Sequence, residues 1–345
     1  MSTVIALDAM GGDHAPACVV DGAVMAAREY GHRLVLVGRA ERLAHELRRH
    51  GLPPGGSGLI SVHDARDVIE MHEPAVAAIR QKKHSSIRVA CHLVREGAAQ
   101  GMVSAGNTGA VMVTAKVVMG TLHGIERPAV MALLPNLKGL SVWLDVGANI
   151  DPRPEHLIQF ALMGCIYSRE ILGVDNPRVG ILSVGEEDSK GNAVTKEVLR
   201  QLRSSSALNV IGNVEGRDIF NGNADVIVSD GFTGNVSLKA IESVAEMLAV
   251  LLRQELTSSL PARLGALLSR AALRRFKKRV DYAEYGGMPL LGVKGSAIIC
   301  HGRSSSKAVK NAVRVAAEVI ESRVNDRIQE VMHSMPGLAA ATEGA

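Results

Sequence analysis

The chain has 345 residues, of which 47% are hydrophobic and 21% charged, an ordinary globular composition that can supply a large core. Aromatic residues make up only 3%, without repeated aromatic-basic interleaving, so the sequence gives no support for nucleic-acid binding. With a net charge of +4, no secretory pattern and no run of about 18 apolar residues, the chain is expected to be cytoplasmic and without a membrane span.

The four cysteines are far apart and form neither a CxxC pair nor a Cys/His cluster: Cys18, Cys91, Cys165 and Cys300. We therefore expect reduced thiols and no metal site. The chain contains no P-loop and no complete GxGxxG fingerprint. The sequence thus predicts neither a nucleotide nor any other cofactor.

The N-terminal part alternates strand and helix patterns, which favours an α/β fold with a parallel sheet. The expected elements are a strand beginning at Val4, helices over 16–30, 41–50, 75–81 and 88–100, strands over 33–37 and 59–63, and a Pro/Gly loop over 51–58. The segment KKHSS at 82–86 has two interpretations, a solvated helix end or a patch that attracts an acidic partner.

The rest of the chain continues the alternation. We expect helices over 110–120, 154–171, 195–204 and 307–333, and strands over 131–134, 140–144, 178–184, 210–212 and 297–300. Residues 1–335 are predicted to form a single catalytic α/β domain, and the Ala/Gly-rich tail over 336–345 is predicted to be disordered.

A strand, a polar glycine turn and a helix start recur three times, over 4–16, 102–115 and 225–242. Unpaired N–H groups at a helix start suit an anion, and glycine lets the backbone approach it closely. Any one loop is equally well explained as a tight turn between a strand and a helix. The polar residues exceed what turns require, so we predict that the three loops form one site: Asp8, Asp13, His14, Ser104, Asn107, Thr108, Asp230, Thr233 and Asn235.

Two other strand ends carry candidate site residues. Asp145 and Asn149 flank glycine in DVGAN, and a ligand site or a solvent-facing turn explains them equally well. Lys190 lies in the polar turn GEEDSKGN and is either a surface lysine or a ligand contact. His301 ends the last expected strand, where a lone histidine is more often a structural hydrogen-bonding group.

A long amphipathic helix is expected over 239–256, followed by a basic segment. Seven basic residues and no acid occur over 263–279, with leucines at helical spacing. Such a helix can lie on an anionic membrane, face an acidic protein or close a dimer. We therefore predict a helical, amphipathic basic arm over 240–282.

Ten motifs in this order resemble the PlsX family of phosphate acyltransferases, over nearly the whole chain. They are DAMGGDHAP, KKHSS, SAGNTGA, GIERPA, DVGAN, PEHL, GNVEGRD, SDGFTGN, YGGMPLLGVKG and HG. The resemblance implies a three-layer α/β/α fold like those of isocitrate dehydrogenase and phosphotransacetylase, with a protruding helical arm.

The resemblance also implies an activity. The enzyme would reversibly form acyl phosphate from a long-chain acyl-[acyl-carrier-protein] and inorganic phosphate, feeding glycerol-3-phosphate acylation in phospholipid synthesis. It would be a cytoplasmic homodimer, peripherally associated with the membrane and handing its product to a membrane glycerol-3-phosphate acyltransferase.

Site roles follow from combining the resemblance with the loops. Lys190 would offset negative charge, Asp230 would orient Lys190 or a phosphate proton, and Asn235 would be an oxyanion donor. Phosphate would lie on helix N–H groups at 107–109 and 233–235. The substrate-binding candidates are Asp8, Gly11, Gly12, Asp13, His14, Ser104, Asn107, Thr108, Gly109, Asp145, Asn149, Gly231, Thr233 and Gly234. Carrier-protein or membrane contact is assigned to Arg263, Arg270, Arg274, Arg275, Lys277 and Lys278.

Two other interpretations stay open at this point. A phosphotransacylase using coenzyme A would differ in the thioester donor that it consumes. A non-catalytic scaffold that recruits lipid-synthesis enzymes to the membrane would not require three polar glycine loops. A nicotinamide dehydrogenase is disfavoured because the dinucleotide fingerprint is missing.

Overall fold

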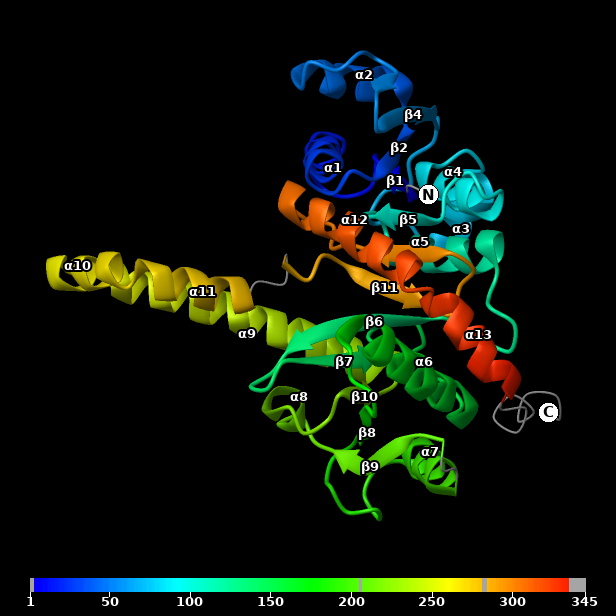
Figure 1. Cartoon of the computed structure of the whole chain (residues 1–345), viewed down its shortest axis with the longest axis vertical. Coiled ribbons are helices and arrows are strands. Elements are labelled where there is room, and N and C mark those ends of the chain that lie inside the picture. The colour runs from blue at the N-terminus through cyan, green and yellow to red at the C-terminus, as the bar shows by residue number, and fades with distance from the viewer. Residues whose placement is uncertain (1–2, 205–206, 281–283, 335–345) are drawn as a thin grey trace.

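The computed structural model describes residues 3–204, 207–280 and 284–334, which surround one 12-stranded sheet (Figure 1). The strands are β1 (Val4–Asp8), β2 (Arg33–Gly38), β3 (Gly56–Ser57), β4 (Ile60–Asp64), β5 (Gly101–Ser104), β6 (Ala129–Pro135), β7 (Leu140–Leu144), β8 (Arg178–Leu182), β9 (Asn209–Val214), β10 (Val226–Val228), β11 (Met288–Leu291) and β12 (Ser296–Ile299). The expected tail over 336–345 lies outside the described residues.

Helices cover both faces of the sheet. They are α1 (Ala17–Tyr30), α2 (Ala40–Arg49), α3 (Ala75–Gln81), α4 (Ser86–Arg95), α5 (Thr108–Thr114), the π-helical segment η1 (Ala115–Met119), α6 (Pro154–Leu172), α7 (Ala193–Ser204), α8 (Asp218–Asn221), α9 (Gly231–Thr257), α10 (Leu260–Leu268), α11 (Arg270–Val280), α12 (Ser306–Glu321) and α13 (Val324–Ser334).

Alternating side chains give each face of the sheet its own apolar core. In β1, Ile5 and Leu7 join the core under α1, α2, α6, α7, α12 and α13. Ala6, between them, joins the core under α3, α4, α5, α8 and the start of α9. The expected three-layer α/β/α architecture is therefore confirmed.

The sheet is mixed, with strand order β3-β4-β2-β1-β5-β12-β11-β6-β7-β10-β8-β9. The set β4, β2, β1, β5 and β12 is parallel, and so is the set β7, β10, β8 and β9. Between them, β11 is antiparallel to both neighbours and β6 is antiparallel to β7. The alternation at the start of the chain predicted a parallel sheet, and the sheet departs from that prediction at β6 and β11, where short hairpins pair β6 with β7 and β11 with β12 in antiparallel fashion.

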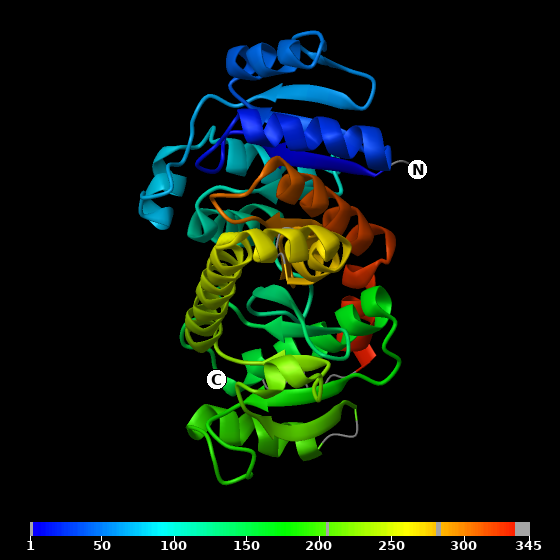
Figure 2. The ribbon, with the colours of Figure 1, turned by 90° about the vertical axis from the view of Figure 1, so that its left-hand side faces the viewer.

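The two parallel sets run in opposite directions, and the twist of the sheet compensates for this reversal. Neighbouring strands are rotated by about 20–25°, so five steps from β5 to β10 accumulate more than a right angle. Figure 2 shows the turn after β1 and the first turn of α9 on the same side of the molecule, in its upper and lower halves. The glycine loops of both strand sets therefore lie on one side.

Several element boundaries differ from expectation. The helix expected over 88–100 ends at Arg95, and Gly97 then takes φ 75°. The helix expected over 307–333 is broken at Arg323, whose φ of 53° cannot continue a right-handed helix. Strands β3 and β11 and helix α8 were not expected, because their apolar patterns are too short to stand out.

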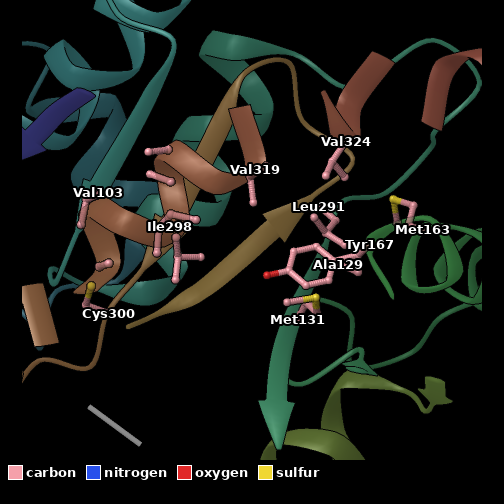
Figure 3. Close-up of a cluster of buried hydrophobic side chains, with 14 of the residues drawn as sticks. Val103, Ala129, Met131, Met163, Tyr167, Leu291, Ile298, Cys300, Val319 and Val324 are labelled. Atoms are coloured by element: carbon pink, nitrogen blue, oxygen red, sulfur yellow. The ribbon is translucent and has the colours of Figure 1, made fainter. Parts of the chain in front are cut away.

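The apolar core continues across the middle of the sheet (Figure 3). Ile298 of β12, Leu291 of β11 and Met131 of β6 are at most 2% exposed and belong to one cluster. Tyr167 of α6 is fully buried in the same cluster. This packing holds the two strand sets, and the loops at their ends, in a fixed relation.

Helices α9, α10 and α11 form the expected arm, which projects far beyond the sheet (Figure 1). Its apolar side chains are uncovered, with Leu248, Leu264 and Leu268 57%, 63% and 87% exposed. Its six predicted contact residues, from Arg263 to Lys278, are also exposed. Within the described residues, no helix combines the length and the apolar composition needed to cross a bilayer.

Candidate active site

The loops after β1, β5 and β12 meet in what we call the first loop cluster, residues 8–14, 104–109 and 301–303. Gly11 approaches the β5 loop so closely that a Cβ there would lie 2.6 Å from the Gly106 nitrogen. Asp13 N donates to the Gly302 carbonyl over 2.8 Å. The first two glycine loops are therefore in contact, whereas the third, over 225–242, belongs to the cluster described below; that all three form one site stays a prediction.

Asp8 organises this cluster from inside. It is 1% exposed, and Ser104 Oγ donates to its Oδ2 over 2.6 Å. Ser104 Oγ in turn accepts from Gly106 N over 3.0 Å. Burial raises the pKa of Asp8, and the hydrogen bond from Ser104 works against that rise. Asp8 and Ser104 thus build the loops and do not face a ligand directly.

Asn107 also has a structural role. Its Oδ1 caps α5 by accepting from Ala110 N over 3.0 Å, and its Nδ2 donates to the carbonyls of Met71 and Glu73, each over 3.0 Å. The N–H groups of Thr108 and Gly109 have no recorded partner within the described residues. Backbone donors, and not the Asn107 side chain, are available to an anion here.

The second loop cluster consists of residues 145–149, 183–192 and 229–235, after β7, β8 and β10. Asp145 is fully buried, and its carboxylate accepts from Val130 N, Gly147 N, Ala148 N and both nitrogens of Asn149. Burial raises the pKa of Asp145, and these donors work against that rise. Asp145 therefore shapes its loop instead of contacting substrate.

Two glycines let α9 begin against this loop. A Cβ on Gly234 would lie 1.9 Å from the Asp145 carbonyl oxygen, and one on Gly231 would lie 2.8 Å from Asn149 backbone atoms. The Gly231 N–H donates to the Asn149 carbonyl over 2.7 Å. These glycines let the helix pack closely against the loop, whereas the sequence pattern predicted that they let the backbone approach a phosphate.

Asp230 is the N-cap of α9. Its Oδ1 accepts from Thr233 N and its Oδ2 from Thr233 Oγ1, each over 2.7 Å. Gly234 N donates to the Asp230 carbonyl over 2.9 Å. The predicted phosphate cradle at 233–235 is therefore wrong in its backbone part, because these N–H groups are already used inside the helix.

Two predicted catalytic side chains remain available. Lys190 is exposed and its ammonium group has no recorded ion pair in the described part of the chain, whereas Glu186 and Asp188 of the same loop pair with Arg217 and Arg203. The Asn235 amide likewise has no recorded hydrogen bond there and lies beside Gly147, with Nδ2 3.4 Å from a Cβ built on that glycine.

The predicted site residues therefore differ in accessibility. The exposed ones are Asp13, His14, Thr108, Lys190 and Thr233. The partly exposed ones are Gly12, Asn107, Gly109, Asp230 and Asn235. The buried ones are Asp8, Gly11, Ser104, Asp145, Asn149, Gly231 and Gly234.

Helix α9 links the two clusters. It starts at Gly231 in the second cluster, and Lys239 lies about 12 Å further along at a rise of about 1.5 Å per residue. There it borders a cleft of about 150 Å³ lined by Lys239, Glu242, Ser243, Glu246, His301 and Arg303. The cleft places α9 opposite the β12 turn of the first cluster.

A network around the buried His156 was not predicted from the sequence. His156 is 1% exposed, its Nε2 lies 2.8 Å from Glu126 Oε2, and its Nδ1 accepts from Arg153 N over 3.0 Å. Burial lowers the pKa of His156. Although burial alone would raise it, hydrogen bonds from His156 and Arg153 hold the pKa of Glu126 below its usual value. The motifs GIERPA and PEHL contain Glu126 and His156, but nothing local indicates that the two residues meet.

Across the described residues, no group of three or more His, Cys, Asp or Glu side chains is placed to hold a metal ion.

Comparison with known proteins adds family and fold. A family model described as "Fatty acid synthesis protein" matches residues 3–327. The chain is 52% identical over 331 residues to the phosphate acyltransferase of Geobacter sulfurreducens, covering 96% of this chain and 94% of that protein. It is 50% identical over 331 residues to that of Pelotomaculum thermopropionicum, covering 96% and 95%.

Among solved structures, a phosphotransacetylase from Streptococcus pyogenes matches with a TM-score of 0.62 at 20% identity, covering 93% of this chain and 94% of that chain. A branched-chain phosphotransacylase from Enterococcus faecalis matches with a TM-score of 0.56 at 14% identity, covering 92% and 98%. At these identities the likeness shows the fold alone, and it confirms the expected phosphotransacetylase-like architecture.

Proposed function

Because this chain belongs to the fatty acid synthesis protein family of phosphate acyltransferases, we propose that it acylates inorganic phosphate from a long-chain acyl-[acyl-carrier-protein]. The acyl phosphate would feed glycerol-3-phosphate acylation in phospholipid synthesis. Two side chains without a recorded partner among the described residues carry this proposal. Lys190 lies in the loop that follows β8, and Asn235 lies near the start of α9, which follows the neighbouring strand β10.

The reaction is a substitution at a thioester carbonyl. A phosphate oxygen bonds to the carbonyl carbon, the carbonyl oxygen becomes an oxyanion, and the carbon–sulfur bond then breaks. The proton of hydrogen phosphate ends on the carrier thiol, so atoms and charge balance. Phosphate near neutral pH is already anionic, so the site must mainly position it and stabilise the oxyanion.

The geometry supports a division of roles in the second loop cluster. Lys190, which has no recorded ion pair among the described residues, would offset the charge of phosphate, and the Asn235 amide would donate to the oxyanion. Asp230 is held in place by Thr233 and would orient Lys190 or the phosphate proton. The exposed residues of the first cluster, Asp13, His14 and Thr108, would contact the rest of the substrate.

The arm supports the proposed partners. Its exposed leucines and exposed basic residues suit an acidic carrier protein or an anionic membrane. We propose a cytoplasmic homodimer, peripherally associated with the membrane, that passes its product to a membrane glycerol-3-phosphate acyltransferase. Prompt transfer would protect an acyl phosphate from hydrolysis.

The donor can be identified with purified protein, phosphate and either a long-chain acyl carrier protein or the matching acyl-coenzyme A. Hydroxylamine traps acyl phosphate as hydroxamate. We expect product from the carrier-protein donor. Product mainly from the coenzyme A donor would replace this proposal by a phosphotransacylase, and no product from either would favour a scaffold.

Replacing Asp230 with Asn should lower turnover about tenfold while leaving thermal stability close to wild type. Asn keeps an oxygen that can cap α9 but removes the charge that orients Lys190 or the phosphate proton. Asp230→Ala should lose both turnover and about 1 kcal/mol of stability, because the cap is lost. Steady-state hydroxamate assays measure turnover, and thermal melts measure stability. Wild-type turnover in Asp230→Asn would show that Asp230 only caps α9 and takes no part in catalysis.

Reversing the charges of Arg274, Arg275 and Lys278 to Glu should weaken binding to the carrier protein or to anionic liposomes. All three are exposed on α11, so the core and the oligomeric state should be unchanged. Liposome flotation, carrier-protein titration and light scattering measure the three properties. Reversal of Arg42, Arg48 and Arg49 on α2 is the matched control, and undiminished binding to both ligands would contradict the assignment of the arm.

A further inference from the structure

We propose that Arg127 is a second phosphate-binding cation, which holds the acceptor phosphate jointly with Lys190. This inference rests on the proposed function of the second loop cluster and adds a residue that the sequence reasoning did not single out.

Topology places Arg127 and Lys190 at the same edge. Because β6 is antiparallel to β7, the start of β6 lies beside the ends of β7, β10 and β8. Arg127 is just before β6, and Lys190 is in the loop after β8. The three strand steps between β6 and β8 span about 14 Å at about 4.8 Å each. Two long side chains can therefore converge from both sides on a ligand above β7 and β10, next to Asp230 and Asn235.

The backbone on both sides of Arg127 is fixed. The preceding residue, Glu126, is bound through its side chain to Arg153 and His156, and its N–H donates to Gln159 Oε1 over 3.1 Å. The following residue, Pro128, accepts from Asn149 Nδ2 over 2.9 Å. The contacts of its two neighbours therefore fix the backbone of Arg127 beside the 145–149 loop, against which α9 packs. A cation that holds a ligand requires such preorganisation.

The Arg127 guanidinium itself is unused. The side chain is half-buried, and no ion pair or hydrogen bond is recorded for it within the part of the chain that the structure describes. Arg178, which is likewise half-buried, is paired with Asp225. A guanidinium presents a rigid fork of donors that matches phosphate, so an unpaired one at this position suits an oxyanion.

The charges at the edge create a need for this cation. A phosphate placed between Asp230 and Asn235 meets the Asp230 carboxylate, while Thr233 N and Gly234 N donate within the helix. Lys190 alone supplies one positive charge against phosphate and Asp230. Arg127 on the opposite side adds a second positive charge, which makes the electrostatic energy of the bound phosphate favourable. Backbone N–H groups at 233–235 would otherwise have had to supply this stabilisation.

The test measures phosphate binding separately from donor use. Arg127→Ala should raise the KM for phosphate at least about tenfold, with a smaller change in the KM for the acyl donor. It should also abolish the rise in Tm that phosphate alone gives the wild-type protein. Arg127→Lys should recover part of both effects, since it keeps the charge without the fork. Arg200→Ala, on the exposed side of α7, is the control expected to match wild type.

Arg127→Gln provides a second variant that keeps polarity and length if Arg127→Ala does not fold. A variant with wild-type KM for phosphate and a wild-type phosphate-dependent Tm would overturn the inference. If wild-type protein forms no acyl phosphate but phosphate still raises its Tm, the proposed function fails. Loss of that rise in Arg127→Ala would then still establish Arg127 as a phosphate ligand.

Discussion

Lys190→Ala is expected to lower the turnover number about 100-fold, because one preorganised charge contact to a developing oxyanion or phosphate is typically worth that much. Lys190 is exposed and has no recorded ion pair or side-chain hydrogen bond among the described residues, so its removal should not disturb the fold. Steady-state hydroxamate assays at saturating donor and phosphate measure the effect, and thermal melts check stability.

Lys196→Ala is the matched control, because Lys196 is an exposed lysine on the neighbouring helix α7. We expect it to retain wild-type turnover. Lys190→Arg should keep part of the activity, since it preserves the charge but alters its geometry. Wild-type turnover in Lys190→Ala would remove Lys190 from the catalytic residues and leave Arg127 as the candidate cation at that edge.

Gly234→Ala is expected to reduce activity at least about tenfold and stability by about 1–3 kcal/mol, the usual range for an overpacked site. The added Cβ would lie 1.9 Å from the Asp145 carbonyl oxygen and 3.0 Å from Ser229 Oγ. Because the nearer of these atoms belongs to the backbone and cannot rotate away, α9 must move away from the 145–149 loop. Asn235, the next residue, would then leave its position beside Gly147.

Gly55→Ala is the control for this substitution, because a Cβ at Gly55 would meet nothing within 4 Å. Urea unfolding and the hydroxamate assay should show a protein close to wild type. If Gly234→Ala is as stable and active as Gly55→Ala, the tight approach of α9 to the 145–149 loop is not needed for the site.

Local sequence patterns identified most of the fold because helix and strand periodicity are properties of neighbouring residues. The expected helix over 75–81 has the same bounds as α3, and the expected strand over 140–144 has the same bounds as β7. The polar glycine loops were also found at strand ends, where open α/β sheets place their sites. The basic arm was recognisable from its charge and leucine spacing alone.

The sequence by itself identified the polar glycine loops at the strand ends, and only the tertiary structure decided what each loop residue contacts. A glycine at 231 or 234 indicates close approach, but the group approached is the 145–149 loop. The helix N–H groups at 233 and 234 look free in sequence, yet Asp230 accepts from both. The role proposed for Arg127 could not be inferred from the GIERPA motif alone, because it depends on β6 lying antiparallel to β7. Hydrogen-bond partners and shared sheet edges are set by contacts between distant segments, and no window of neighbouring residues contains them.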